Sequence, residues 1–254
     1  MKIGVCGGVA KAPIIKALGY DYVEENMFKI ASLSESEFNE TVEFYKNLDI
    51  PVYSFNGFFG GDITIYGEGS LDEIREYAAL ALKRAHALGG KVCVIGSGKA
   101  RAILDGVSLE FARERFVEVV SICCDIADGY GIRIVVEPLN SGETNFINTV
   151  SEAAEIAKLT GKRNAGSLVD FFHFAYEKEN DGGIVNNGDT LMHAHLARPD
   201  DRYAPKLEDA ETVARWIGLL KSINYTGALS VESKYKDFEA EITEARKCFD
   251  EIVL

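Results

Sequence analysis

The chain is poor in positive charge and has no long apolar run. Its 27 lysine and arginine residues are outnumbered by 40 aspartate and glutamate residues, which gives a formal net charge of −13. Because lysine and arginine neutralise phosphates in most nucleic-acid complexes, this balance counts against a nucleic-acid partner. No stretch approaches the roughly 18 apolar residues of a membrane helix, and no apolar leader precedes a small-residue cleavage site. We therefore expect a cytoplasmic protein with no membrane contact.

Cysteine is also scarce, and its spacing is not that of a metal or disulfide framework. The five cysteines are an odd number, lie mostly in apolar segments and form no CxxC pair. Cys123 and Cys124 are adjacent on a predicted helix, so their side chains diverge and do not share a structural zinc ion. We expect reduced thiols that serve in packing.

Short apolar segments recur along the chain and alternate with helical patterns. The predicted strands are 3–6, 20–24, 51–55, 91–96, 132–137, 166–170, 192–196 and 228–232. Strict alternation of strands and helices predicts a parallel sheet with right-handed crossovers. Eight such units in 254 residues suit a closed barrel. We therefore predict the α/β class and a single (β/α)8 TIM barrel, with residues 1–254 forming one domain because no Pro-, Ser- or Gly-rich linker divides them.

Two helix starts carry a capping-box pattern, a serine followed three residues later by a glutamate. Ser34 and Glu37 predict one helix, and Ser70 and Glu73 predict another whose apolar residues recur with a helical period up to position 88. Gly89 and the following glycine are typical of a helix end.

Four of the predicted strands end in a residue that can bind a metal ion: Glu137, Asp170, His195 and Glu232. The C-terminal ends of barrel strands share one face, so we expect these side chains to converge there. Three carboxylates about 5 Å apart would repel one another by about 3 kcal/mol per pair at an effective dielectric constant of about 20, which a divalent cation would offset. We predict one divalent metal ion, with Mn²⁺ as first choice and Mg²⁺, Co²⁺ or Zn²⁺ as alternatives.

Neighbouring residues allow both functional and structural interpretations. We expect His193 to point away from His195 and to be packed rather than to bind metal. Gly96, Gly98 and Lys99 lack the full GxxxxGK[ST] pattern, which favours a short turn over a phosphate site. An aromatic group after the third predicted strand could form a wall over a ligand or part of the core. It consists of Tyr53, Phe55, Phe58 and Phe59.

Several segments resemble the xylose isomerase-like TIM barrels, the sugar phosphate isomerase/epimerase group, and most of all the ketose 3-epimerases that act on D-tagatose or D-psicose. These segments are VVEPLNSGE (135–143), VDFFH (169–173), HAHLARPDDR (193–202) and SVES (230–233). The family binds one metal ion through a Glu, an Asp, a His and a Glu after the fifth to eighth strands. The resemblance therefore implies the same four metal ligands that the strand ends indicate.

The resemblance also implies roles in catalysis and substrate binding. Glu137 and Glu232 would act as acid and base on opposite faces of a sugar. Glu143 and His173 match family residues that contact substrate, and an arginine after the metal histidine does so too. We choose Arg202 for that position, with Arg198 as the alternative.

These implications define a metal-dependent sugar isomerase or epimerase, with C3 epimerisation of a ketose through a cis-enediolate as first choice. Inosose dehydratase-like and hydroxypyruvate isomerase-like enzymes are alternatives, and a non-catalytic sugar-binding barrel is an alternative of another class. The paired glutamates count against a mere binder, which needs no acid and base. Related endonucleases assemble three metal ions from many histidines, whereas this chain has four histidines in total. Family members commonly form dimers or tetramers, which implies a homo-oligomer.

Overall fold

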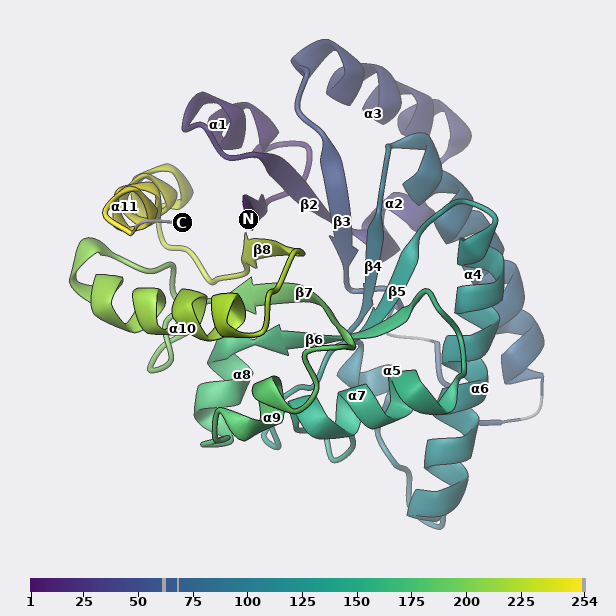
Figure 1. The fold of residues 1–254 in the computed structure, drawn as a ribbon. Helices are drawn as coiled ribbons and strands as arrows, with labels where there is room; N and C mark the ends of the chain where they lie inside the picture. The colour runs from purple at the N-terminus through teal and green to yellow at the C-terminus, as the bar shows by residue number, and fades with distance from the viewer. Residues whose placement is uncertain (61–62, 68, 253–254) are drawn as a thin grey trace.

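The computed structural model describes residues 1–60, 63–67 and 69–252, and in this part of the chain eight parallel strands close into a barrel (Figure 1). The strands follow chain order around the barrel, and β8 pairs with β1 to close it. Their bounds are β1 (Lys2–Cys6), β2 (Tyr22–Asn26), β3 (Val52–Asn56), β4 (Val92–Ile95), β5 (Arg133–Val136), β6 (Ala165–Asp170), β7 (Leu191–Leu196) and β8 (Ala228–Val231). The predicted TIM barrel is confirmed, and each predicted strand overlaps an observed one.

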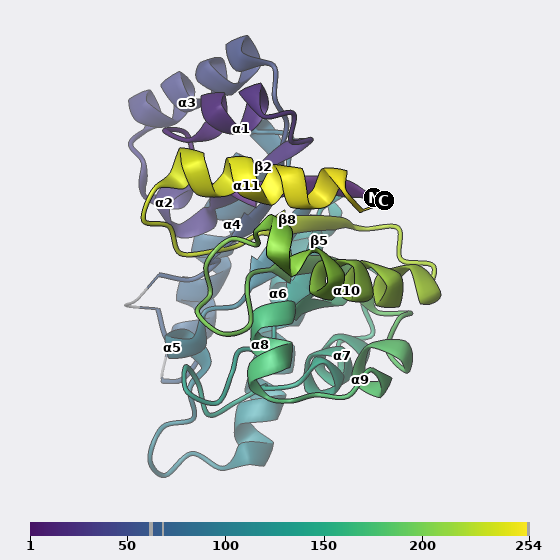
Figure 2. The same cartoon turned by 90° about the vertical axis from the view of Figure 1, so that its left-hand side faces the viewer.

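Helices follow the strands and surround the barrel (Figures 1 and 2). They are α1 (Ala12–Ala17), α2 (Met27–Ser32), α3 (Glu35–Leu48), α4 (Ser70–Ala87), α5 (Gly98–Arg101), α6 (Leu109–Asp128), α7 (Val150–Leu159), α8 (Phe171–Tyr176), α9 (Gly182–Val185), α10 (Ala210–Ser222) and α11 (Phe238–Asp250), with a 3-10 turn η1 (Leu207–Asp209). Both views place α11 beside α1, and the Tyr20 hydroxyl donates to the Ile242 carbonyl oxygen at 2.8 Å. Among the described residues, no helix combines the length and the hydropathy needed to cross a membrane.

The two predicted capping boxes have different outcomes. The box at the start of α3 is confirmed, because the Ser34 hydroxyl accepts from the backbone N–H of Glu37 and the Glu37 carboxylate accepts from the backbone N–H of Ser34. The prediction of a capping box at the start of α4 is wrong, because Gly69 and not Ser70 is the N-cap residue. Gly69 precedes that helix with a φ of 79°, a conformation that glycine adopts without strain. Ser70 is then the first helical residue, and its hydroxyl donates to the carbonyl oxygen of Gly67 at 3.0 Å.

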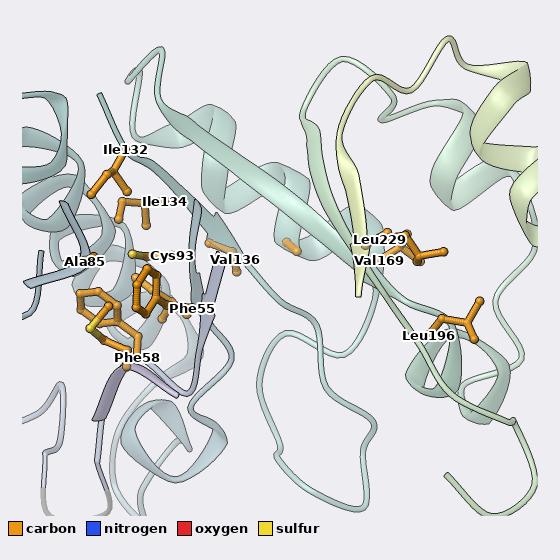
Figure 3. Close-up of a cluster of buried hydrophobic side chains, with 14 of the residues drawn as sticks. Phe55, Phe58, Ala85, Cys93, Ile132, Ile134, Val136, Val169, Leu196 and Leu229 are labelled. Atoms are coloured by element: carbon orange, nitrogen blue, oxygen red, sulfur yellow. The ribbon is translucent and has the colours of Figure 1, made fainter. Parts of the chain in front are cut away.

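The main core lies between the barrel strands and the helices that cover them. Phe55 and Phe58 are fully buried there beside Cys93 of β4 (Figure 3), and Phe59 is 5% exposed. Tyr53 packs instead against a smaller cluster of barrel residues that includes Val92 and Leu168. The aromatic group, of which Tyr53 and Phe55 lie in β3 and Phe58 and Phe59 follow it, is therefore part of the core, the second of its two interpretations. All five cysteines are free thiols.

Candidate metal centre

The four residues predicted from strand ends come together at the C-terminal rim of the barrel. Asp170 ends β6, His195 lies one residue before the end of β7, and Glu137 and Glu232 directly follow β5 and β8. One ligand atom from each lies within 4.8 Å of the others. They share this place because β5 to β8 are consecutive neighbours whose C-terminal ends form one side of the rim.

The donor atoms suit a divalent cation. The Asp170 side chain is buried, and its Oδ1 accepts from the backbone N–H of Phe172 at 2.8 Å while Oδ2 has no hydrogen-bond partner. The Nδ1 atom of His195 lies 3.0 Å from Glu137 Oε1 and 3.4 Å from Glu232 Oε2. Three carboxylates with one imidazole form an oxygen-rich set of the kind that binds hard or borderline divalent ions. The group is thus a candidate metal site.

The electrostatics of the site also call for a positive charge. Burial and the neighbouring Glu232 raise the pKa of Glu137. Burial likewise raises the pKa of Asp170, and the carboxylates of Glu232 and Glu137 add to that effect. Burial alone would raise the pKa of Glu232, but His195 and Arg202 outweigh it and the pKa is lowered. Carboxylates that resist ionisation side by side are stabilised in their charged form by a cation between them.

A cavity of about 380 Å³ opens directly onto the site and is lined by Glu137, Glu232, Glu143 and Arg202, among others. The segment that carries Gly96, Gly98 and Lys99 forms another part of its wall. A Cβ atom on Gly96 would lie 1.7 Å from Glu137 Oε2, so the glycine makes room for that carboxylate. This close approach gives the glycine-rich turn a function that requires no phosphate.

Arg202 connects two of the carboxylates at the cavity. Its guanidinium donates to Glu143 Oε1 at 2.8 Å and to Glu232 Oε2 at 3.3 Å. Arg198 instead pairs with Asp201 at 3.1 Å, with Asp209 3.9 Å away, and is not among the residues that line the cavity. Of the two arginines, only Arg202 lines the cavity next to the four converging residues.

His173 lies beside the metal centre with one ring nitrogen free. Its Nδ1 accepts from the backbone N–H of Asn140 at 3.2 Å, so the proton of a neutral imidazole resides on Nε2. That Nε2 is buried without a hydrogen-bond partner and lies 3.5 Å from Asp170 Oδ2. His173 is not among the residues that line the cavity, in contrast to Glu143 and Arg202.

The structure corrects the expectation for His193. His193 and His195 both contact the buried carboxylate of Glu24, each through Nε2 at 2.8 Å. Side chains two residues apart on a strand share a face, so the expectation that His193 points away was wrong. His193 is packed below the metal centre and is not one of the four converging residues.

Two polar residues at the site were missed from the sequence. Glu24 lies in β2 and is the last residue of the strand predicted at 20–24, so the rule that identified the other strand-end acids would also have identified it. Asn56 ends β3, and its Nδ2 donates to Glu232 Oε1 at 2.6 Å. An asparagine at a strand end is too common in turns to be singled out by pattern.

Comparisons with known proteins identify the family of the chain. A family model described as xylose isomerase-like TIM barrel matches residues 13–252. The D-psicose 3-epimerase of Agrobacterium fabrum is 33% identical over 120 residues, which cover 46% of this chain and 40% of that relative. The inosose isomerase of Bacillus velezensis is 26% identical over 231 residues, covering 84% of this chain and 79% of the relative.

A structural comparison extends the likeness to nearly the whole chain. The crystal structure of a D-allulose 3-epimerase from Methylomonas sp. superposes with a TM-score of 0.84 at 19% identity, covering 99% of this chain and 97% of that one. At this identity the likeness concerns the fold. The sequence match with the psicose epimerase spans less than half of that relative's length, so it does not by itself transfer an activity.

Proposed function

The chain belongs to the xylose isomerase-like TIM barrel family, and from that premise we propose that it is a metal-dependent sugar isomerase that inverts C3 of a ketose. The observation that carries this proposal is the convergence of Glu137, Asp170, His195 and Glu232 at the rim of the barrel. Two of these acids, Glu137 and Glu232, also line the adjoining cavity, where a small sugar would meet both. The relatives that match in sequence include a D-psicose 3-epimerase and an inosose isomerase.

A divalent cation held by these four residues would stabilise negative charge on two neighbouring sugar oxygens. The protein residues would move the proton. One glutamate removes the proton from C3, the electron pair of the broken C–H bond spreads into the adjacent carbonyl, and the other glutamate delivers a proton to the opposite face of C3. No oxidant or reductant is needed, since one C–H bond breaks and another forms.

The neighbouring residues support this division of labour. The Asn56 side-chain NH2 group and the Arg202 guanidinium both donate to Glu232, so both stabilise it as the carboxylate that accepts a proton. The free Nε2–H of His173 would bind a substrate oxygen. Glu143 and Arg202 would hold hydroxyl groups farther from the metal, because they line the same cavity.

The test is exchange of a sugar C–H proton with solvent. The protein is loaded with Mn²⁺ and incubated in D₂O with a panel of free ketoses, and the products are recovered free of metal for NMR. Deuterium at C3 together with a new ketose is the expected result. Glu137→Gln should abolish it, whereas Glu43→Gln on the exposed face of α3 should not. Deuterium at C1 or C2 together with an aldose product would show that the reaction is aldose–ketose isomerisation and not epimerisation.

An inosose is the second candidate substrate. It is favoured by the length of the match to the inosose isomerase, which covers 84% of this chain. The same panel therefore includes inososes, and exchange with them alone would replace the ketose proposal. Metal binding without exchange into any sugar would overturn the catalytic proposal and leave a sugar-binding barrel.

A further inference from the structure

We propose that Glu24 is a positioning residue that fixes the ring orientation and the tautomer of His195, so that Nδ1 of this imidazole presents its lone pair to the metal ion. The inference rests on the metal site proposed above and adds a residue from β2, on the other side of the barrel from β6. Metal-bound histidines commonly donate their second ring N–H to a carboxylate, which orients the ring and strengthens it as a ligand.

The first support is the geometry of His195. Its two ring nitrogens face different carboxylates: Nε2 lies 2.8 Å from Glu24 Oε1, and Nδ1 lies 3.0 Å from Glu137 Oε1. A carboxylate only accepts hydrogen bonds, so the contact with Glu24 requires a proton on Nε2. Nδ1 also faces a carboxylate, and a cation bound between Nδ1 and Glu137 would take the place of a proton there, so that the neutral imidazole keeps its proton on Nε2 and its lone pair on Nδ1.

The second support is the way in which Glu24 itself is held. Its Oε2 accepts from His193 Nε2 at 2.8 Å, from the Ser54 hydroxyl at 2.6 Å and from the Ser230 hydroxyl at 2.5 Å. The carboxylate is 1% exposed, and every donor around it is buried as well. A buried carboxylate with this many donors has one orientation, and it passes that orientation on to His195.

The role is distinct from that of the metal ligands. Glu24 Oε1 is directed at Nε2 of His195, the ring nitrogen that faces away from Glu137 and Glu232. Glu24 converges instead with His193 and His195, a set with one carboxylate, whereas the set of Glu137, Asp170, His195 and Glu232 has three carboxylates and two members that line the cavity. His193 takes the other carboxylate oxygen and thereby helps to lock Glu24 in place. His193 and His195 lie two residues apart on β7 and both contact Glu24, but only His195 also belongs to the four converging residues.

The experiment uses the imidazole nitrogens as the readout, in addition to metal affinity. The chain has four histidines, so a protein labelled with ¹⁵N-histidine gives a spectrum in which each ring can be assigned by single substitutions. In the zinc-loaded wild-type protein we expect His195 to bind through Nδ1 and to carry its proton on Nε2. Binding of Zn²⁺ through Nε2 of His195 would overturn the proposal without the need for any variant.

Glu24→Gln and Glu25→Gln form a matched pair for the second measurement. Glu25 is the next residue of β2 and is also buried, but it accepts from the Tyr45 hydroxyl and touches neither histidine. We expect Glu24→Gln to raise the Kd for Zn²⁺ by roughly 10- to 100-fold and to change the proton position on His193 or His195, because the amide has only one accepting oxygen. Glu25→Gln should leave both readouts unchanged.

The outcomes separate this proposal from the one on which it rests. If the wild-type protein does not bind Zn²⁺ at these residues, the metal site itself is overturned, and the role of Glu24 with it. If the wild type binds Zn²⁺ but Glu24→Gln has the same Kd and the same proton positions, only the role of Glu24 is overturned. An equal loss in Glu25→Gln would also overturn it, because the effect would then come from the strand rather than from the contact with His195.

Discussion

A single methyl group at Gly96 should disable the metal centre while leaving the barrel folded. The Cβ of an alanine there would lie 1.7 Å from Glu137 Oε2, whereas real Cβ contacts are essentially never closer than 3.0 Å. The carboxylate would therefore have to move by at least the difference, about 1.3 Å. Because the clashing atom is the end of a flexible side chain, Glu137 can rotate away without unfolding the protein. Misplacement of a reacting group by about 1 Å can cost about 100-fold in rate.

The assay measures Mn²⁺ affinity by calorimetry, turnover by solvent-proton exchange, and folding by circular dichroism. We expect Gly96→Ala to keep the melting temperature within a few degrees of the wild-type value, to weaken metal binding and to lower turnover about 100-fold. Gly218→Ala is the matched control, because Gly218 lies in α10 with nothing within 4 Å of an added Cβ. Wild-type metal affinity and turnover in a folded Gly96→Ala protein would refute the reasoning.

Two further predictions concern Arg202 and Glu179. Arg202→Lys removes the double contact with Glu143 and Glu232 and should lower kcat/KM by about 10- to 100-fold, which corresponds to the loss of one charge-assisted hydrogen bond. Arg198→Lys is the control and should leave kcat/KM unchanged. Equal losses of kcat/KM in the two variants would contradict the prediction. Burial, with smaller contributions from Glu152 and Glu177, raises the pKa of Glu179 from 4.5 to about 7. Between these two pH values the folded protein binds a proton at Glu179 that the unfolded chain has lost, so the free energy of unfolding should fall as the pH rises from 4.5 to about 7. Glu179→Gln should flatten that part of the profile of melting temperature against pH, and an unchanged slope would count against the assignment.

The sequence was most informative where one physical rule acts on a whole element. Buried parallel strands require continuous apolar runs, and for that reason all eight strands were found. The rule that strand ends meet at one face then placed Glu137, Asp170, His195 and Glu232 together.

Pattern was less informative where a single backbone conformation or a long-range contact decides. Gly69 begins α4 through a left-handed conformation, which displaced the expected cap at Ser70. Glu24 contacts a histidine 171 positions away, and nothing near it in the chain indicates that partner. The choice between Arg198 and Arg202 likewise depended on the path of the loop, since Arg202 has a φ of 62° that few non-glycine residues adopt.

The double contact of Arg202 has a consequence for how the rim can diversify. Loops at the top of such barrels usually vary independently, which lets one scaffold acquire many specificities. Here the loops after β5, β7 and β8 are joined through Glu143, Arg202 and Glu232. A substitution at Glu143 therefore changes the electrostatic surroundings of Glu232 without touching it. We expect these three loops to evolve as one unit, so that a new substrate range in a mutant library would come from joint changes rather than from any loop varied alone.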